Sequence, residues 1–171
     1  MMTHRPVGGS LRFVVCVCST SRYASYGRCT TPPPDDRSGR LAIELIEGAG
    51  HTASYVLVSD DERMIDGVIE HFLSGEDDVL LLIGGTGLTS RDITIERAER
   101  WYHKPVTGFG ELFRLLSFHE VGTAAMLSRA SAGVCSGKAI FCVPGSSKAV
   151  ELALSKLILC EVGHVIRHAR E

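Results

Sequence analysis

The chain has 171 residues, with 18 basic and 20 acidic side chains, 44% hydrophobic residues and a formal net charge of -2. This length suits one soluble domain that buries a core without disulfide or metal staples. A near-neutral chain has no global basic field, so we expect no nucleic-acid partner. The longest apolar runs, residues 13–17 and 79–83, are far shorter than the roughly 20 residues that cross a bilayer. We therefore expect a cytoplasmic protein with no membrane partner.

The chain reads as one domain with a short extension. Residues 1–11 are polar and contain glycine and proline, so we expect a flexible leader before a single domain over residues 12–171. The cysteines include no Cys-x-x-Cys pair and lie mostly in apolar segments, which favours buried small side chains over a zinc site or a redox pair. They are Cys16, Cys18, Cys29, Cys135, Cys142 and Cys160.

The start of the domain predicts a strand, a long loop, a helix and a second strand. The apolar, β-favouring run over residues 12–19 is typical of a strand covered on both faces. Residues 20–36 hold a glycine and three consecutive prolines, which predicts a loop. Ser38 is placed to cap a helix that ends at Gly50. A second strand is predicted over residues 52–58.

The pattern then repeats. Asp60 or Asp61 opens a helix that Gly75 closes, and a third strand follows over residues 78–83. A further helix is predicted over residues 94–101. This alternation is the βαβαβ signature of a parallel sheet with helices on both faces. The remaining predictions are helices over residues 110–118 and 122–130, a hairpin of residues 132–135 and 139–143, an amphipathic helix over residues 146–160 and a last helix from about residue 161.

The most informative motif is the turn Gly84-Gly85-Thr86-Gly87, which directly follows the third predicted strand. Open α/β sheets bind ligands at the carboxyl ends of their strands, and glycines let backbone N–H groups approach an anion. The turn matches neither the Walker A loop nor the dinucleotide fingerprint. Taken alone, it fits a phosphate site and a tight connection without a ligand about equally well.

Two aspartates follow the ends of predicted strands. Asp92 shares its short segment with hydroxyl and guanidinium side chains, and Asp60 comes directly after the second strand. Each could simply cap the next helix. However, the ends of neighbouring parallel strands converge on one crevice, where the two carboxylates could hold a divalent ion between them.

A third strand-end loop, Pro144-Gly145-Ser146-Ser147-Lys148, opens the long amphipathic helix. Its free N–H groups would favour an anion. A cation in the first turn opposes the helix dipole, so Lys148 indicates a negative ligand more than a simple surface lysine. Glu111 follows Gly108-Phe109-Gly110 and fits either a polar contact or an ordinary first-turn carboxylate.

Four ordered motifs together resemble the MoaB/MogA family of molybdenum cofactor biosynthesis proteins. The likeness spans about residues 13–167 and includes Asp36-Arg37-Ser38-Gly39 before the first predicted helix. Four positions depart from the family pattern: Ser90, Ile95 and Ser147 stand where many relatives have proline, and Thr20 stands where many relatives have an aspartate after serine. The motifs are the run over residues 84–94, Gly108-Phe109-Gly110-Glu111, Leu127-Ser128-Arg129-Ala130 and the run over residues 144–149.

This resemblance implies a three-layer α/β/α molybdopterin-binding fold, with a mostly parallel central sheet and one antiparallel strand. It also implies the Mg²⁺-dependent adenylylation of molybdopterin by ATP, with release of pyrophosphate. Asp60 and Asp92 match the two aspartates that are critical in the family, as catalytic and metal-binding groups. The implied substrate- and nucleotide-binding residues are Asp36, Ser38, Gly84, Gly85, Thr86, Gly87, Glu111, Pro144, Gly145, Ser146 and Lys148.

The resemblance further implies self-association into trimers or hexamers, with the hexamer expected, and contacts with other proteins of the cofactor pathway. Two other functions stay open at this point. The chain could bind molybdopterin without catalysis, or it could be a generic nucleotide-binding regulatory domain. Binding of molybdopterin and of ATP, each measured separately, distinguishes these two alternatives.

Overall fold

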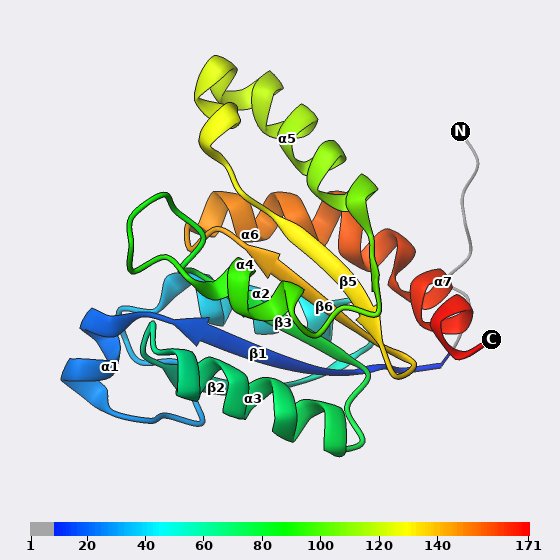
Figure 1. Cartoon of the computed structure of the whole chain (residues 1–171), viewed down its shortest axis with the longest axis horizontal. Coiled ribbons are helices and arrows are strands. Elements are labelled where there is room, and N and C mark those ends of the chain that lie inside the picture. The colour runs from blue at the N-terminus through cyan, green and yellow to red at the C-terminus, as the bar shows by residue number, and fades with distance from the viewer. Residues whose placement is uncertain (1–8) are drawn as a thin grey trace.

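The computed structural model describes residues 9–171, which form three layers around one six-stranded sheet (Figure 1). The predicted leader over residues 1–11 therefore lies mostly outside the described residues. In the sheet the strands follow the order β2-β1-β3-β6-β5-β4. Their bounds are β1 (Arg12–Cys18), β2 (Thr52–Val58), β3 (Val79–Ile83), β4 (Lys104–Pro105), β5 (Ser131–Cys135) and β6 (Lys138–Val143).

Strands β1, β2, β3 and β6 run parallel to one another, whereas β5 is antiparallel to both of its neighbours, β6 and β4. This confirms the mostly parallel sheet with one antiparallel strand. The helices are α1 (Thr20–Tyr26), α2 (Arg37–Gly48), α3 (Glu62–Ser74), α4 (Thr94–Glu99), α5 (Thr107–Val121), the 3₁₀ helix η1 (Gly122–Leu127), α6 (Ser147–Ala153), the π-helical segment η2 (Leu154–Ile158) and α7 (Leu159–Arg170).

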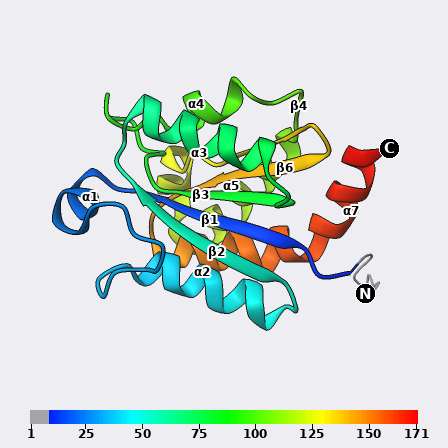
Figure 2. The same ribbon diagram turned by 90° about the horizontal axis from the view of Figure 1, so that it is seen from below.

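The core consists of two layers, one on each face of the sheet. Because strand side chains alternate, Val15 and Val17 of β1 pack on one face and Cys16 and Cys18 on the other. Helices α2, α5, α6 and α7 supply the first layer, and α3 and α4 supply the second. Figure 2 shows the sheet between these two groups of helices. Cys16, Cys18 and Cys142 are buried and no cysteine in residues 9–171 is paired, as expected for small apolar side chains.

Two predictions before β2 are wrong. The region predicted as a loop over residues 20–36 begins with α1, because Ser19 caps that helix by accepting from Arg22 N at 3.4 Å. Gly27, at φ 67°, ends the helix, so the loop signals hold only beyond it. Ser38 is not the cap of α2; Asp36 takes that role by accepting from Gly39 N at 3.0 Å.

The second half of the chain shows four smaller differences. Helix α5 begins at Thr107, and the region predicted as a helix over residues 122–130 contains a 3₁₀ helix that ends at Leu127. Strand β4 has two residues and includes Pro105, which an edge strand tolerates because its outer side needs no ladder donor. The predicted break near residue 160 is absent, since η2 carries α6 into α7 without interruption.

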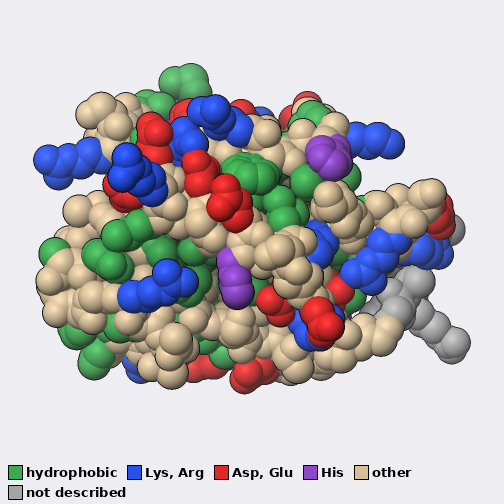
Figure 3. All heavy atoms as spheres, turned by 60° about the horizontal axis from the view of Figure 1, so that its bottom comes forward, with side chains coloured by type: hydrophobic (Ala, Val, Ile, Leu, Met, Phe, Trp, Pro, Cys, Tyr) green, Lys and Arg blue, Asp and Glu red, His purple; other side chains and the backbone are tan. Residues whose placement is uncertain are grey.

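The two described ends of the chain lie at the amino ends of the parallel strands. Gly9 and Glu171 line the same open cavity there, and Asp78 accepts from Arg12 N at 2.7 Å and from Arg170 Nη2 at 2.6 Å. On the face shown in Figure 3, acidic and basic side chains intermingle without separating into large areas of one sign. None of the helices in the described part of the chain combines the length and apolar character that a bilayer crossing requires.

Candidate functional site

A cavity of about 350 Å³ opens at the carboxyl ends of β3 and β6. There the two glycine loops meet: Gly84 N donates to Val143 O at 3.0 Å, and a Cβ at Gly145 would lie 3.4 Å from Gly84 Cα. This is the position at which open α/β sheets bind ligands. The lining residues are Gly84, Gly85, Thr86, Gly87, Asp92, Leu127, Ser128, Arg129, Pro144 and Gly145.

The glycine turn has a backbone that only glycine fits well. Gly84 and Gly85 have φ values of 94° and 64°, which side-chain-bearing residues rarely adopt. A Cβ at Gly85 would collide with Thr94 Oγ1 and would lie 2.7 Å from Asp60 Oδ1. The absence of a side chain at Gly85 therefore lets Asp60 and Thr94 approach the turn closely.

Asp60 is held by one carboxylate oxygen and leaves the other without a partner. Its Oδ2 accepts from Thr20 N at 2.9 Å and from Thr20 Oγ1 at 2.8 Å. Within residues 9–171, Asp60 Oδ1 and Thr94 Oγ1 are buried and have no hydrogen-bond partner. Asp61 caps α3 by accepting from Met64 N at 3.0 Å, so Asp60 is not the helix cap.

Asp92 lies on the other side of the turn. Its Oδ2 accepts from Thr89 N at 3.0 Å and from Thr89 Oγ1 at 2.6 Å. These hydrogen bonds, foremost that of the Thr89 side chain, lower the pKa of Asp92 against the opposing effect of burial, and the charge of Arg129 contributes. The N-cap position of α4 is Ile93, so Asp92 does not cap this helix either.

The structure places both aspartates beside the same short turn. A Cβ at Gly85 would lie 2.7 Å from Asp60 Oδ1, and one at Gly87 would lie 2.7 Å from Asp92 Oδ2. Two residues of chain span at most about 7 Å. The described residues hold no cluster of three or more His, Cys, Asp or Glu side chains suited to a metal. One or two carboxylates, completed by substrate phosphates and water, is the ligand set with which proteins usually hold Mg²⁺.

Arg129 joins the site although no role was predicted for it. Its Nε donates to Thr86 O at 2.9 Å, and its Nη1 pairs with Glu96 Oε1 of α4 at 2.5 Å. The guanidinium thus ties the glycine turn to α4 and adds positive charge to the cavity. In the sequence, Arg129 is marked only by the motif over residues 127–130, which resembles the family pattern but to which no chemical role was assigned.

Asp36 and Ser38 support the site from behind instead of lining the cavity. Asp36 is buried and accepts from Tyr55 Oη at 2.5 Å, and burial followed by this contact raises the pKa of Tyr55. Ser38 is also buried, and its hydroxyl donates to Gly145 O at 2.6 Å. Ser38 thereby anchors the second glycine loop to α2.

The remaining predicted residues are divided between two places. Ser146 caps α6 by accepting from Ala149 N at 3.2 Å, and Lys148 is exposed in the first turn of that helix. Glu111 lines a separate cavity of about 320 Å³ together with Glu99 and Arg114. Apart from Asp36 and Ser38, the predicted site residues that do not line the cavity at the glycine turn are therefore Asp60, Glu111, Ser146 and Lys148.

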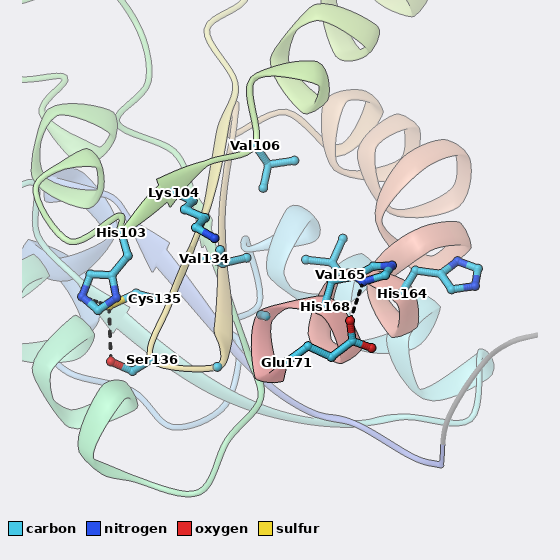
Figure 4. A pocket seen from close by; sticks show the side chains of 12 residues that line it. His103, Lys104, Val106, Val134, Cys135, Ser136, His164, Val165, His168 and Glu171 are labelled. Atoms are coloured by element: carbon cyan, nitrogen blue, oxygen red, sulfur yellow. Dashed lines mark hydrogen bonds and ion pairs between the residues drawn. The ribbon is translucent and has the colours of Figure 1, made fainter.

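A further cavity of about 520 Å³ lies between β4, β5 and α7, near the amino end of β6 (Figure 4). It is lined by Lys104 and three histidines, and Cys135 Sγ lies 3.5 Å from His103 Nε2. At its α7 side, His168 pairs with Glu171 at 3.2 Å. This cavity is at the opposite end of the sheet from the glycine turn, and it contains no residue that the sequence predicts as functional.

Comparison with known sequences gives one family. The family model described as a probable molybdopterin binding domain matches residues 16–164. Molybdenum cofactor biosynthesis protein B of Bacillus anthracis is 50% identical over 133 residues, which cover 76% of this chain and 79% of that protein. The probable molybdopterin adenylyltransferase of Methanocaldococcus jannaschii is 37% identical over 163 residues, which cover 95% and 96% of the two chains.

Comparison with solved structures agrees. A crystal structure of molybdenum cofactor biosynthesis protein B has a TM-score of 0.84 and 41% identity, covering 97% of this chain and 98% of that one. The tungsten cofactor synthesizing protein MoaB of Pyrococcus furiosus has a TM-score of 0.84 and 35% identity, with coverage of 96% and 100%. Sequence, fold and strand-end site thus lead to one conclusion: the chain belongs to the MoaB/MogA family of molybdenum cofactor biosynthesis proteins.

Proposed function

We propose that this chain transfers the adenylyl group of ATP to molybdopterin. A terminal phosphate oxygen of molybdopterin attacks the α-phosphorus of ATP, and the bond to the β-phosphate oxygen breaks to release pyrophosphate. The observation that carries the proposal is the buried, unpartnered Oδ1 of Asp60 beside a glycine turn that also contacts Asp92. The name of the Methanocaldococcus jannaschii relative, a probable molybdopterin adenylyltransferase, supports the same reaction.

The two aspartates fit a magnesium ion. Mg²⁺ prefers carboxylate oxygens, and Asp60 Oδ1 is a carboxylate oxygen for which the described chain supplies no donor. Asp60 and Asp92 would hold the ion beside the glycine turn. The ion would neutralise the charge of the triphosphate. Because the pKa of Asp92 is lowered, its carboxylate stays ionised, and able to bind the ion, at pH values below the usual pKa range of aspartate.

The other groups would bind and orient the two substrates. Backbone N–H groups of residues 85–87 and 145–146 would donate to phosphate oxygens, with the Arg129 guanidinium adding positive charge, whereas the Gly84 N–H is already bonded to Val143 O. Ser38 would keep the second loop in place through Gly145 O. Lys148 would attract an anion at the start of α6, and Glu111 would contact a more distant part of a substrate from its own cavity.

Pyrophosphate release tests the proposal. Protein incubated with molybdopterin, ATP and Mg²⁺ should release pyrophosphate, and the Asp92→Asn variant should lose roughly 100-fold or more of this turnover while keeping its fold. Asp61→Asn is the matched control, because Asp61 neighbours Asp60 but only caps α3, and asparagine caps helices equally well. Wild-type protein that binds both substrates but releases no pyrophosphate would contradict the proposal.

Two binding measurements separate the alternatives if turnover is absent. Calorimetry that shows molybdopterin binding without nucleotide turnover would identify a non-catalytic molybdopterin-binding protein of the pathway. ATP binding without any binding of molybdopterin would identify a nucleotide-binding regulatory domain. Protein that binds neither molybdopterin nor ATP would instead indicate that a protein partner from the cofactor pathway is missing.

We also propose that the chain assembles into a homo-oligomer, a hexamer in preference to a trimer. The carboxyl end of α5 and the following η1 project from the rest of the domain (Figure 1). The outer side of α5, together with η1, exposes large apolar side chains that a soluble monomer would rarely leave together in water. These residues, which we call the α5–η1 face, are Leu112, Leu115, Phe118, Val121, Met126 and Leu127.

A further inference from the structure

We propose that Thr20 is a positioning residue that orients the Asp60 carboxylate toward the glycine turn. The inference rests on the proposed function for the role of Asp60, but the orientation itself can be measured independently. Thr20 is brought to Asp60 by the parallel pairing of β1 and β2, in which Cys18 is opposite Val58. Thr20 and Asp60 each follow their strand by two residues, and Ser19 N donates to Val58 O at 2.9 Å to keep the two strand ends together.

The hydroxyl of Thr20 uses its full hydrogen-bonding capacity in this arrangement. Its oxygen accepts from Ser59 Oγ at 3.2 Å and from Asp60 N at 3.3 Å, and its single proton is donated to Asp60 Oδ2 at 2.8 Å. A hydroxyl has one proton and two lone pairs, so the two accepted bonds direct the proton to the carboxylate. Thr20 N supplies a second donor to the same oxygen, at 2.9 Å.

Two donors on Oδ2 determine where Oδ1 lies. With Oδ2 fixed on Thr20, the other oxygen of Asp60 projects to the open side of Gly85, 2.7 Å from where a Cβ would be. There it is buried and has no partner in the described chain. Asp60 does not itself line the cavity at the glycine turn, but Gly85, against which its oxygen lies, does. A buried oxygen that is left unpaired is costly unless a bound group satisfies it. Thr20 thus prevents the carboxylate from turning its free oxygen back into the protein.

Three variants test the role of the hydroxyl. Thr20→Val keeps the branched shape but removes the hydroxyl, Thr20→Ser keeps the hydroxyl, and Ser25→Ala removes another α1 hydroxyl that donates only to Ser21 O. Thr20 is exposed, so none of them should change the urea midpoint of unfolding by much. Crystal structures and Mn²⁺ titrations, with and without ATP, then report carboxylate orientation and metal affinity directly.

In Thr20→Val we expect the Asp60 carboxylate to occupy a second rotamer. Both the affinity for Mn²⁺ and kcat should fall by about tenfold to a hundredfold, while the KM for ATP stays nearly unchanged. Thr20→Ser and Ser25→Ala should stay within about threefold of the wild type. An unchanged Asp60 rotamer in Thr20→Val, or an equal loss in Thr20→Ser, would overturn the inference. Absence of pyrophosphate release in the wild type would contradict the proposed function alone, because the crystallographic comparison would still decide the role of Thr20.

Discussion

At the scale of single residues, the candidate site depends on the missing side chain of Gly85. The turn is in contact with Asp60 on one side and with Thr94 on another, and both oxygens that face it are buried. Any Cβ there would have to displace one of these side chains. The same glycine therefore governs both the local backbone and the approach of a proposed catalytic group.

We predict that Gly85→Ala destabilises the protein by at least about 2 kcal/mol and abolishes pyrophosphate release. The positive φ of 64° is unfavourable for alanine, and its methyl group would collide with Thr94 Oγ1. Urea unfolding followed by circular dichroism measures the loss of stability. Gly67→Ala is the control, because Gly67 lies in α3 with open space around its Cβ position, so alanine should stabilise the helix by roughly 0.5–1 kcal/mol. Equal stability of Gly85→Ala and wild type would contradict the described turn.

The functional side chains were predictable from the sequence to different degrees. Asp60 and Asp92 stand out because each follows a strand, yet the sequence leaves helix capping open for both. Only the structure shows that Asp61 and Ile93 occupy the cap positions. Arg129 could not have been found by spacing, since it reaches Thr86 from a segment that is distant in sequence.

At the scale of secondary-structure elements, α4 is held to α3 by a set of charged contacts. Arg97 of α4 forms a two-pronged ion pair with Asp66 of α3, with Nε to Oδ1 at 3.1 Å, and it also pairs with Glu62 at 3.1 Å. These contacts lie one turn beyond Thr94 and so fix the helix that borders the glycine turn. The hydrogen bonds from Arg97, followed by those from Trp101, lower the pKa of Asp66 against the opposing effect of its burial.

We predict that Asp66→Asn lowers the thermal unfolding midpoint at neutral pH and that this difference narrows in acid. A carboxyl group with a lowered pKa in the folded state stabilises the fold above its unfolded pKa, near 4. This stabilisation is lost as the pH falls through the lower folded-state value. Calorimetry of both proteins between about pH 7 and pH 2.5 should show the difference in midpoint decreasing below about pH 4. A difference that stays constant over this range would argue against the ion pair.

Helix periodicity and strand composition place most elements correctly, but they do not detect short or irregular ones. Helix α1 has seven residues, none of them buried, so it has no apolar stripe to recognise. The π-helical segment η2 carries the chain from α6 into α7 while Leu154 and Ile158 remain buried. Local sequence shows only a change in apolar spacing at this point, which a break in the helix would explain as well.

At the scale of the whole molecule, the α5–η1 face holds most of the large apolar side chains that the described residues expose. Leu115 and Phe118 are 53% and 52% exposed and lie three residues apart on one side of α5. Leu127, at the end of η1, is 56% exposed and also lines the cavity at the glycine turn. The proposed assembly surface and the proposed active site therefore share an edge.

We predict that the double variant Leu115→Asp, Phe118→Asp has the mass of the 18.5 kDa monomer in multi-angle light scattering, while the wild type is a hexamer. Each chain of the double variant would bring two aspartates into the interface. Burying these charges without ionic partners costs more free energy than the apolar contacts return, so the assembly should dissociate. Glu70→Lys, on the exposed side of α3, changes charge elsewhere and should leave the assembly intact. A monomeric wild type at micromolar concentration would refute the proposed assembly, and a double variant that stays oligomeric would place the interface on another face.

The overall architecture was the most predictable level, because alternating strands and helices allow few arrangements once connections must be short and right-handed. The alternation predicted a parallel sheet with helices on both faces, and the hairpin signal near residues 132–143 predicted its antiparallel member. The sheet order itself, with β6 inserted between β3 and β5, is a long-range property that no local pattern encodes.

The meeting of Gly9 and Glu171 at the amino ends of the strands has a practical consequence for engineering. Because both positions lie at the end of the sheet opposite the glycine loops, an affinity tag or a fluorescent protein joined after Glu171 leaves the loops free for ligand titration. The same proximity would let a short peptide join Glu171 to Gly9 in a circular permutant, with new termini opened in an exposed connection such as the one after α3.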